Sequence, residues 1–135
     1  MTGGDEVYLL DTNIFLEILL DREHAPVIRD MLTRKPAIPF FVSDFSVYSI
    51  GIFLTRRKLF THFSSFIDDL YRRDIRIQSL ANDELKQIPR WCEQYGMDFD
   101  DAYQCGIAET YQLRIVSLDR DFDSVPCGRI HPKDL

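Results

Sequence analysis

The chain contains 135 residues, has a formal net charge of −6, and is 45% apolar. A folded chain of this length buries about two thirds of the surface that it exposes when unfolded, so we expect one domain over residues 1–135. Ten Phe and six Tyr exclude a disordered chain, and no apolar run reaches the roughly 20 residues needed to cross a bilayer. The acidic residues 1–6 are unlike a secretory signal, which indicates a cytoplasmic protein.

Cysteine and histidine, which often bind zinc, form no recognisable motif. Cys92, Cys105 and Cys127 are odd in number and lack paired CxxC spacing, so we expect ordinary reduced thiols. We expect the three histidines at the surface or satisfied by local hydrogen bonds.

Charge is distributed unevenly along the chain. Residues 31–80 contain eight basic residues against four acids, whereas the segments before and after them each carry an excess of five acids. This pattern is typical of a carboxylate cluster beside a surface that contacts phosphates. Basic side chains often do no more than solvate helix faces, so that simpler interpretation stays open.

Short apolar runs alternate with segments of helical periodicity. The first part of the chain predicts a strand at residues 7–10, a helix capped by Thr12 or Asn13, a helix at 25–34, and a strand at 40–42 bounded by Pro36 and Pro39. The remainder predicts a helix capped by Ser43 or Asp44, a helix at 59–72, a strand at 75–77, a helix from Asn82 or Asp83 through Cys92 that Gly96 ends, a helix at 101–112, and strands at 114–118 and 129–131. Strands separated by helices predict an α/β fold, a three-layer α/β/α sandwich with a central, mostly parallel sheet.

Two acids directly follow predicted strands. Asp11 follows the first strand, and Asp119 follows the strand at residues 114–118. Open α/β sheets bind ligands at the carboxyl ends of their strands, so both acids belong at that edge. Asp101, at the start of the helix that leads into the second of these strands, is a third candidate. Carboxylates about 5 Å apart repel by about 3 kcal/mol per pair at an effective dielectric near 20, and a cation would offset this repulsion.

Hard carboxylate ligands favour Mg²⁺ or Mn²⁺, which polarises a bound phosphate and lowers the pKa of an attacking water. Because neither strand-end motif contains a histidine, zinc is not expected. Phosphodiester hydrolysis is the chemistry that this pattern favours. Asp121 and Asp123 compete with Asp119 for its role, and Asp98 and Asp100 compete with Asp101.

At these residues the sequence resembles the PIN domain family. The resemblance rests on Leu10-Asp11-Thr12-Asn13, on Asp100-Asp101-Ala102, and on Ser117-Leu118-Asp119-Arg120-Asp121-Phe122, which look like the family's three acidic motifs. The motifs occur in the family's order, and the resemblance covers about residues 7–131. PIN domains are metal-dependent ribonucleases with an α/β/α fold, are often homodimers, and many are toxins of VapC-type toxin–antitoxin pairs.

The resemblance implies a metal-dependent endoribonuclease that uses Mg²⁺ or Mn²⁺. Asp11, Asp101 and Asp119 match the catalytic, metal-binding acids. The resemblance implies supporting roles for Thr12, Asn13, Ser49, Ser117 and Asp121. The implied partners are RNA, an antitoxin protein and a second copy of the chain. We expect the RNA surface around Arg56, Arg57 and Lys58, with an affinity that falls as salt rises.

One position departs from the family's pattern. The family usually has a Glu on the helix after the second strand, and the segment at residues 42–50 places Ser49 there. A hydroxyl is a poorer cation ligand than a carboxylate, so the site loses one negative charge. Asp44 precedes Ser49 by about one and a half helical turns and is expected to point elsewhere.

Other interpretations stay open. With a weakened metal site, the chain would be a catalytically weak PIN scaffold that binds RNA or a protein partner. A phosphatase with Asp11 as nucleophile is less favoured, because Asn13 stands where that family needs a second Asp. A nicotinamide enzyme is disfavoured because no GxGxxG follows the first strand. Trp91 follows core helical spacing, so we expect it in the core or at a dimer surface rather than as a platform for bases.

Overall fold

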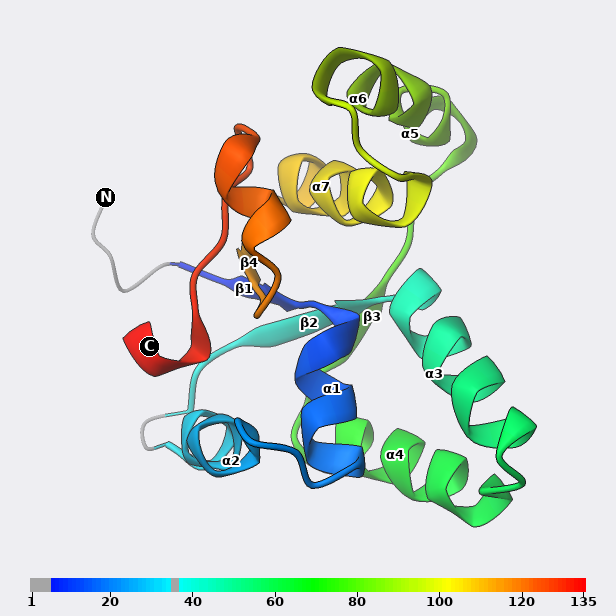
Figure 1. Cartoon of the computed structure of the whole chain (residues 1–135), viewed down its shortest axis with the longest axis vertical. Coiled ribbons are helices and arrows are strands. Elements are labelled where there is room, and N and C mark those ends of the chain that lie inside the picture. The colour runs from blue at the N-terminus through cyan, green and yellow to red at the C-terminus, as the bar shows by residue number, and fades with distance from the viewer. Residues whose placement is uncertain (1–5, 35–36) are drawn as a thin grey trace.

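A parallel sheet forms the centre of the computed structural model, which describes residues 6–34 and 37–135 (Figure 1). Residues 1–5 of the acidic start and Pro36 lie outside the described residues. The strands found are β1 (Tyr8–Leu10), β2 (Phe40–Ser43), β3 (Arg76–Gln78) and β4 (Arg114–Val116). They pair in the order β3-β2-β1-β4, and every pairing is parallel.

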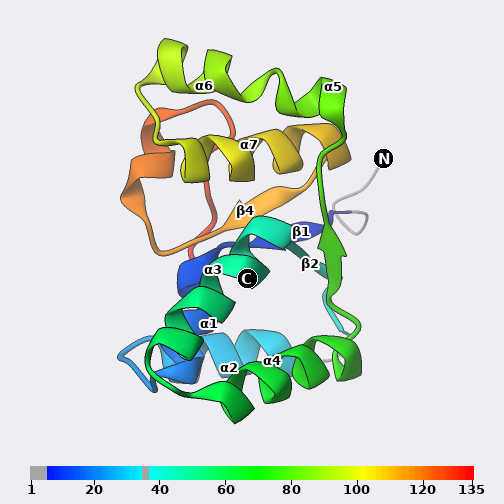
Figure 2. The ribbon, with the colours of Figure 1, turned by 90° about the vertical axis from the view of Figure 1, so that its right-hand side faces the viewer.

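Helices cover both faces of the sheet (Figures 1 and 2). One face carries α1 (Thr12–Leu19), α2 (Ala25–Thr33), α3 (Asp44–Arg56) and α4 (Phe60–Arg72), and the other carries α5 (Asn82–Leu85), α6 (Ile88–Tyr95) and α7 (Phe99–Tyr111). Two 3₁₀ turns, η2 (Arg120–Ser124) and η3 (Pro132–Asp134), follow β4. The predicted three-layer α/β/α sandwich is confirmed. Within the two described ranges, no helix is both long and apolar enough to cross a bilayer.

The sheet divides the interior into two apolar cores. Neighbouring residues of a strand point to opposite faces, as the pleated backbone requires. Leu10 and Val116 therefore pack with residues of α1–α4, while Leu9 and Ile115 pack with residues of α5–α7. Because β1 and β4 are apolar on both faces, the polar residues beside them lie at the strand ends.

Two predicted elements differ in the structure. The helix expected from residue 82 through Cys92 is divided into α5 and α6. Pro89 lies in the first turn of α6, where a backbone N–H has no intrahelical partner, so proline is tolerated there. Gly96 ends α6 as expected, with a φ of 64° that glycine adopts without steric cost. The strand expected at residues 129–131 is reduced to a single bridge between Ile130 and Val116.

The prediction of three reduced thiols is wrong for two of them. Cys105 and Cys127 form a disulfide, with Cα atoms 5.9 Å apart, whereas Cys92 is free. The two partners are separated by 22 residues, and only the packing of α7 against the segment after η2 brings them together. The bond therefore links the helix that carries Asp101 to the segment that follows Asp119.

Candidate metal centre and its hydrogen-bond network

The three predicted acids meet at the carboxyl edge of the sheet. Asp11 directly follows β1, and its N–H donates to the carbonyl of Val116 at the end of β4 at 3.0 Å. Asp119 comes three residues after that strand, and Asp101 lies in the first turn of α7. Asp11 and Asp119 are both close enough to Asp101 to raise its pKa, and Asp119 also raises the pKa of Asp11.

Asp11 is buried, with only 7% of its surface exposed, and both of its carboxylate oxygens accept hydrogen bonds. Oδ1 accepts from the Thr12 N–H at 2.8 Å and from Gln104 Nε2 at 2.9 Å. Oδ2 accepts from Ser117 Oγ at 2.7 Å and from Asn13 Nδ2 at 3.3 Å. Asp11 is therefore the N-cap of α1, and the prediction of Thr12 or Asn13 as the cap is wrong.

Ser117 connects two of the acidic motifs. Its buried Oγ donates to Asp11 and accepts from the Asp119 N–H at 2.9 Å and from Asn13 Nδ2 at 3.1 Å. The side-chain oxygen of Asn13 accepts from the Leu118 N–H at 3.3 Å. The segment that carries Asp119 is thus tied to the start of α1. Burial raises the pKa of Asp11, while hydrogen bonds from Ser117 and Gln104 offset part of that rise.

Two buried residues of this network, Gln104 and Ser46, were not predicted from the sequence. Gln104 is 1% exposed, and its Nε2 donates to Asp11 and to Ser46 Oγ at 2.8 Å. Ser46 in turn hydrogen-bonds the Thr12 hydroxyl at 2.7 Å. Gln104 Oε1 has no hydrogen-bond partner among the described residues. Gln104 follows Asp101 by three residues, a spacing that places both on one helix face and could have revealed it.

A second group of acids is open to solvent. Asp101, Asp119 and Asp121 each offer a carboxylate oxygen, and these oxygens all lie within 4.8 Å of one another. Asp101 and Asp119 are half-buried, Asp121 is exposed, and Asp119 Oδ1 accepts from the Asp121 N–H at 2.9 Å. Asp121, expected only in a supporting role, therefore joins this cluster. Asp11 lies beside the cluster and outside the group of three.

Crowding of carboxylates perturbs Asp101 in particular. Partial burial raises its pKa to about 7, and repulsion from Asp100, Asp11, Asp119 and Asp98 adds to the effect. Among residues 6–34 and 37–135, no salt bridge joins Lys, Arg or His to Asp101, Asp119 or Asp121. The cluster is therefore a site of uncompensated negative charge.

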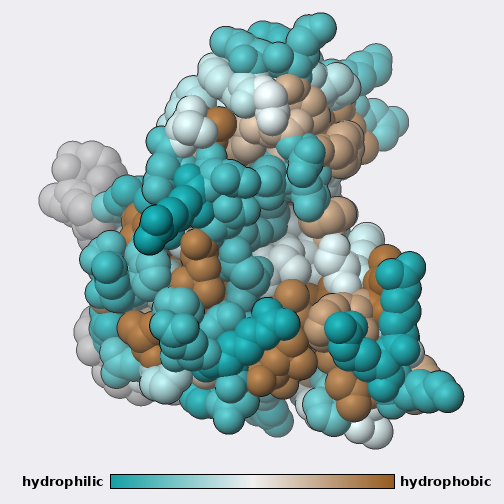
Figure 3. Space-filling model, viewed as in Figure 1, coloured by the Kyte–Doolittle hydropathy of each residue, from teal (hydrophilic) through white to brown (hydrophobic). Residues whose placement is uncertain are grey.

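A cavity of about 230 Å³ opens beside the acids, between the start of α1, α3 and α7. Ser49 lines it together with Asp11 and Asp101, so the hydroxyl that replaces the family's Glu does face this site. Asp44 points elsewhere, as expected, and accepts a hydrogen bond from the Tyr103 hydroxyl at 2.7 Å. On the face seen in Figure 3, hydrophilic side chains cover η2, and the surface is hollowed between the regions of α7 and α3.

The basic triplet lies at the other end of α3. Arg56 follows Ser49 by seven residues, about 10 Å along the helix axis, in the direction away from the acids. The Arg57 guanidinium lies over the Phe53 ring, 3.5 Å from its centroid, and also donates to the Phe53 carbonyl. Arg56 and Lys58 are exposed. The structure thus separates the predicted RNA surface from the acidic cavity by two helical turns.

Solved structures with the same fold include several toxin proteins. A toxin–antitoxin complex from Klebsiella pneumoniae superposes with a TM-score of 0.73 at 16% identity, covering 95% of this chain and 99% of that one. The VapC20 toxin of Mycobacterium tuberculosis, which cleaves the sarcin–ricin loop, gives 0.71 at 14% identity, covering 88% and 94%. VapBC2 from Rickettsia felis, bound to a promoter DNA fragment, gives 0.67 at 14% identity, covering 91% and 96%.

Identities this low establish the shared fold and no more. A comparison of the sequence with curated proteins finds no match. The sequence itself shows the family, because the family model of the PIN domain matches residues 8–126. This range includes all three acidic motifs. The chain belongs to the PIN domain family.

Proposed function

We propose that this PIN domain is a metal-dependent endoribonuclease that hydrolyses RNA phosphodiester bonds. The observation that carries the proposal is the open cluster of Asp101, Asp119 and Asp121, whose oxygens lie within 4.8 Å of one another. When ionised, each pair at that separation repels by about 3 kcal/mol at an effective dielectric near 20. A divalent cation beside a phosphate is the partner that makes such a cluster favourable.

Mg²⁺ and Mn²⁺ fit the donor set, because both prefer carboxylate oxygens and retain water molecules. Asp101, Asp119 and Asp121 would hold the ion. When bound, it supplies Lewis-acid polarisation of the phosphate and a more acidic water. The surrounding residues position the acids: Ser117 holds the Asp119 backbone, and Gln104 holds Asp11.

Asp11 is the fourth acid of the proposed site. Its charge raises the pKa of Asp101 from within the protein. Its hydrogen bonds tie the end of β1 to Ser117 after β4 and to Gln104 of α7. Direct ligation by Asp11, which the family pattern implies, requires one of its oxygens to exchange a hydrogen bond for the ion. We propose catalytic roles for Asp11, Asp101 and Asp119.

Cleavage of a mixed pool of structured RNAs tests the nuclease. The reaction is run with Mn²⁺, with Mg²⁺ and with chelator, comparing wild type, Asp101→Asn and the control Asp83→Asn. Asp83 is an exposed acid on α5, outside the acidic cavity, so the control makes the same charge change elsewhere. We expect metal-dependent cutting that falls about 100-fold or more in Asp101→Asn alone. Cleavage that survives in Asp101→Asn would contradict the proposal.

Ser49 supports a second candidate, the catalytically weak scaffold. The cavity beside the acids presents a hydroxyl where the family usually has a carboxylate, which lowers the charge available to a cation. Calorimetric titration with Mn²⁺ separates the two candidates. Binding that Asp101→Asn abolishes supports the nuclease, and an absence of binding by folded wild type supports the scaffold.

A toxin role within a toxin–antitoxin pair is supported by the folds of the similar structures, two of which come from such complexes. We infer an antitoxin partner and a homodimer for this chain. Co-expression with the product of an adjacent small gene for a DNA-binding protein tests the first inference. Light scattering of the purified chain tests the second, and a monomer at all concentrations would contradict it.

A further inference from the structure

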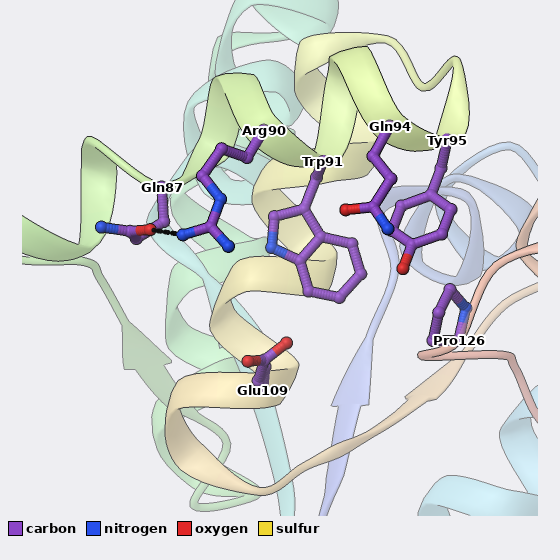
Figure 4. A pocket seen from close by; sticks show the side chains of 7 residues that line it. All are labelled: Gln87, Arg90, Trp91, Gln94, Tyr95, Glu109 and Pro126. Carbon is purple, nitrogen blue, oxygen red and sulfur yellow. Dashed lines mark hydrogen bonds between the residues drawn. The ribbon is translucent and has the colours of Figure 1, made fainter.

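A separate cavity of about 310 Å³ lies between α6 and α7 (Figure 4). None of the three clustered acids lines it. Trp91 of α6 stands at its centre, flanked by Arg90 and Tyr95, with Glu109 of α7 facing them. The Trp91 and Tyr95 ring centroids are 5.5 Å apart, and the rings are tilted by 43°. Trp91 packs against the core, as expected, but it also lines this cavity, which we call the Trp91 pocket.

Close packing at one end of α6 holds the pocket in place. A Cβ added to Gly106 of α7 would lie 2.6 Å from Ile88 Cδ1, so the two helices approach there as nearly as a glycine allows. Trp91 lies three residues after Ile88 and projects from α6 toward α7 (Figure 4). The indole is therefore carried by a rigid helix pair rather than by a loop.

The polar groups of the Trp91 pocket offer both kinds of hydrogen bond. Glu109 contributes a carboxylate acceptor, and within the described part of the chain it forms no salt bridge. Arg90 contributes a guanidinium, of which one nitrogen donates to Gln87 Oε1 at 2.6 Å. An aromatic face with an acceptor and a guanidinium beside it is the combination that recognises a nucleobase.

Guanine suits this combination better than the other bases. Its Watson–Crick edge carries two adjacent N–H donors, N1 and N2, which one carboxylate accepts together. Arg is also the commonest side chain on guanine O6 and N7. Adenine and cytosine present a single amino group on that edge, and uracil a single imino group, so each leaves one oxygen of Glu109 without a partner.

The Trp91 pocket leads toward the acidic cluster. Tyr95 also lines a further cavity of about 300 Å³, whose other walls include Asp101 and Asp121. Val125 lines that cavity, and the next residue, Pro126, lines the Trp91 pocket. Along α7, Glu109 follows Asp101 by eight residues, about 12 Å along the helix axis. A few nucleotides of single-stranded RNA can extend over that distance.

We propose that the Trp91 pocket binds a guanine base of the RNA a few nucleotides from the phosphate held at the acidic cluster. Trp91 stacks on the base, Glu109 accepts from its N1–H and N2–H, and Arg90 donates to its O6 side. The placement of this base along a substrate rests on the proposed nuclease function. The recognition of guanine by the pocket does not.

Trp91 is the only tryptophan of the chain, so its fluorescence reports directly on the pocket. We would titrate the protein in chelator with GMP, AMP, CMP and UMP, and correct for nucleotide absorbance with N-acetyltryptophanamide. We expect GMP to quench Trp91 and to bind about tenfold more tightly than the other three. No saturable quenching, or equal affinities for all four nucleotides, would overturn the proposal.

Glu109→Gln tests the recognition itself, with Glu93→Gln as its matched control. Both glutamates are exposed, and Glu93 lies on α6 outside the pocket lining. Glu109→Gln should lose about tenfold in GMP affinity and most of the preference over AMP, whereas Glu93→Gln should bind like wild type. Unaltered GMP preference in Glu109→Gln would overturn the assignment of the pocket.

The metal-free titration separates this inference from the nuclease proposal. Asp101→Asn should bind GMP like wild type, because Asp101 lies outside the pocket lining. GMP quenching by a protein without nuclease activity would leave the guanine pocket standing. Metal-dependent cleavage by a protein that shows no guanine preference would overturn the pocket and leave the nuclease intact.

Discussion

The acidic residues at the carboxyl edge of the sheet fall into two groups that differ in burial and in hydrogen bonding. Asp11 is buried, and each of its oxygens accepts hydrogen bonds from the protein. Asp101, Asp119 and Asp121 are partly or fully exposed, with oxygens within 4.8 Å of one another and no salt bridge among the described residues. The protein supplies donors to both oxygens of the first carboxylate, whereas the described residues give the other three a single hydrogen bond, from the Asp121 N–H to Asp119.

The two groups therefore differ in what they contribute to the stability of the metal-free protein. A buried carboxylate with several donors holds elements together, because removing it leaves those donors unsatisfied. Crowded, ionised carboxylates with few donors do the reverse, because their mutual repulsion destabilises the fold. Removing the negative charge at the two places should therefore change stability in opposite directions.

Asp11→Ala should have the largest effect on stability. Loss of the carboxylate leaves Gln104 Nε2, Ser117 Oγ and the Thr12 N–H without their acceptor, and we expect the free energy of unfolding to fall by about 2 kcal/mol or more. Urea unfolding in chelator measures it. If Asp11→Ala were as stable as wild type, Asp11 would not hold the ends of β1 and β4 together.

Ser49→Glu should strengthen metal binding at the acidic cluster. The new carboxylate faces the cavity lined by Asp11 and Asp101, so we expect Mn²⁺ affinity to rise about tenfold and apo stability to fall. Tyr48→Glu is the matched control, because Tyr48 is 65% exposed and lies outside this cavity. Equal affinities in the two variants would show that position 49 does not reach the ion.

Asp101→Asn should stabilise the protein at high pH. The pKa of Asp101 is raised from 3.8 to about 7 in the folded state, so the unfolded chain ionises first as pH rises. Ionisation of Asp101 thus lowers the stability of wild type between about pH 4 and pH 7, and Asp101→Asn lacks this contribution. We expect a gain of about 1 kcal/mol at pH 8 after solvent screening, and little gain near pH 4. Added Mn²⁺ should remove this advantage by stabilising wild type, and a pH-independent difference would contradict the assignment.

The basic triplet should show the smallest effect, because it lies two helical turns from Ser49. RNA affinity falls as salt rises, and the double substitution Arg56→Gln with Lys58→Gln should make this fall less steep. The slope of log affinity against log salt should become less negative by about 0.7 for each phosphate that the triplet no longer neutralises. Lys86→Gln, an exposed change on the opposite face of the sheet, is the control. An unchanged slope would remove the triplet from the RNA surface.

Sequence patterns located most elements and the acids of the strand ends. Asp11 and Asp119 were found because a carboxylate directly after an apolar strand has one place to lie in a parallel sheet. The spacing of Gln104 from Asp101 indicates only a shared helix face, and the hydrogen bonds of Gln104 to Asp11 and Ser46 depend on how α7 packs against α1 and α3. Asp121 was placed only in a supporting role, since the 3₁₀ turn η2 decides which acids after β4 face Asp101.

By itself, the sequence determined the alternation of strands and helices and the acids that follow the strands, because apolar periodicity and residue order are local properties. Only the tertiary structure decided which acid is buried and which are exposed, because that depends on contacts between residues up to 106 positions apart, such as Ser117 with Asp11. The disulfide between Cys105 and Cys127 and the pocket around Trp91 were decided in the same way. Each depends on how α7 packs against neighbouring elements, which no sequence spacing records.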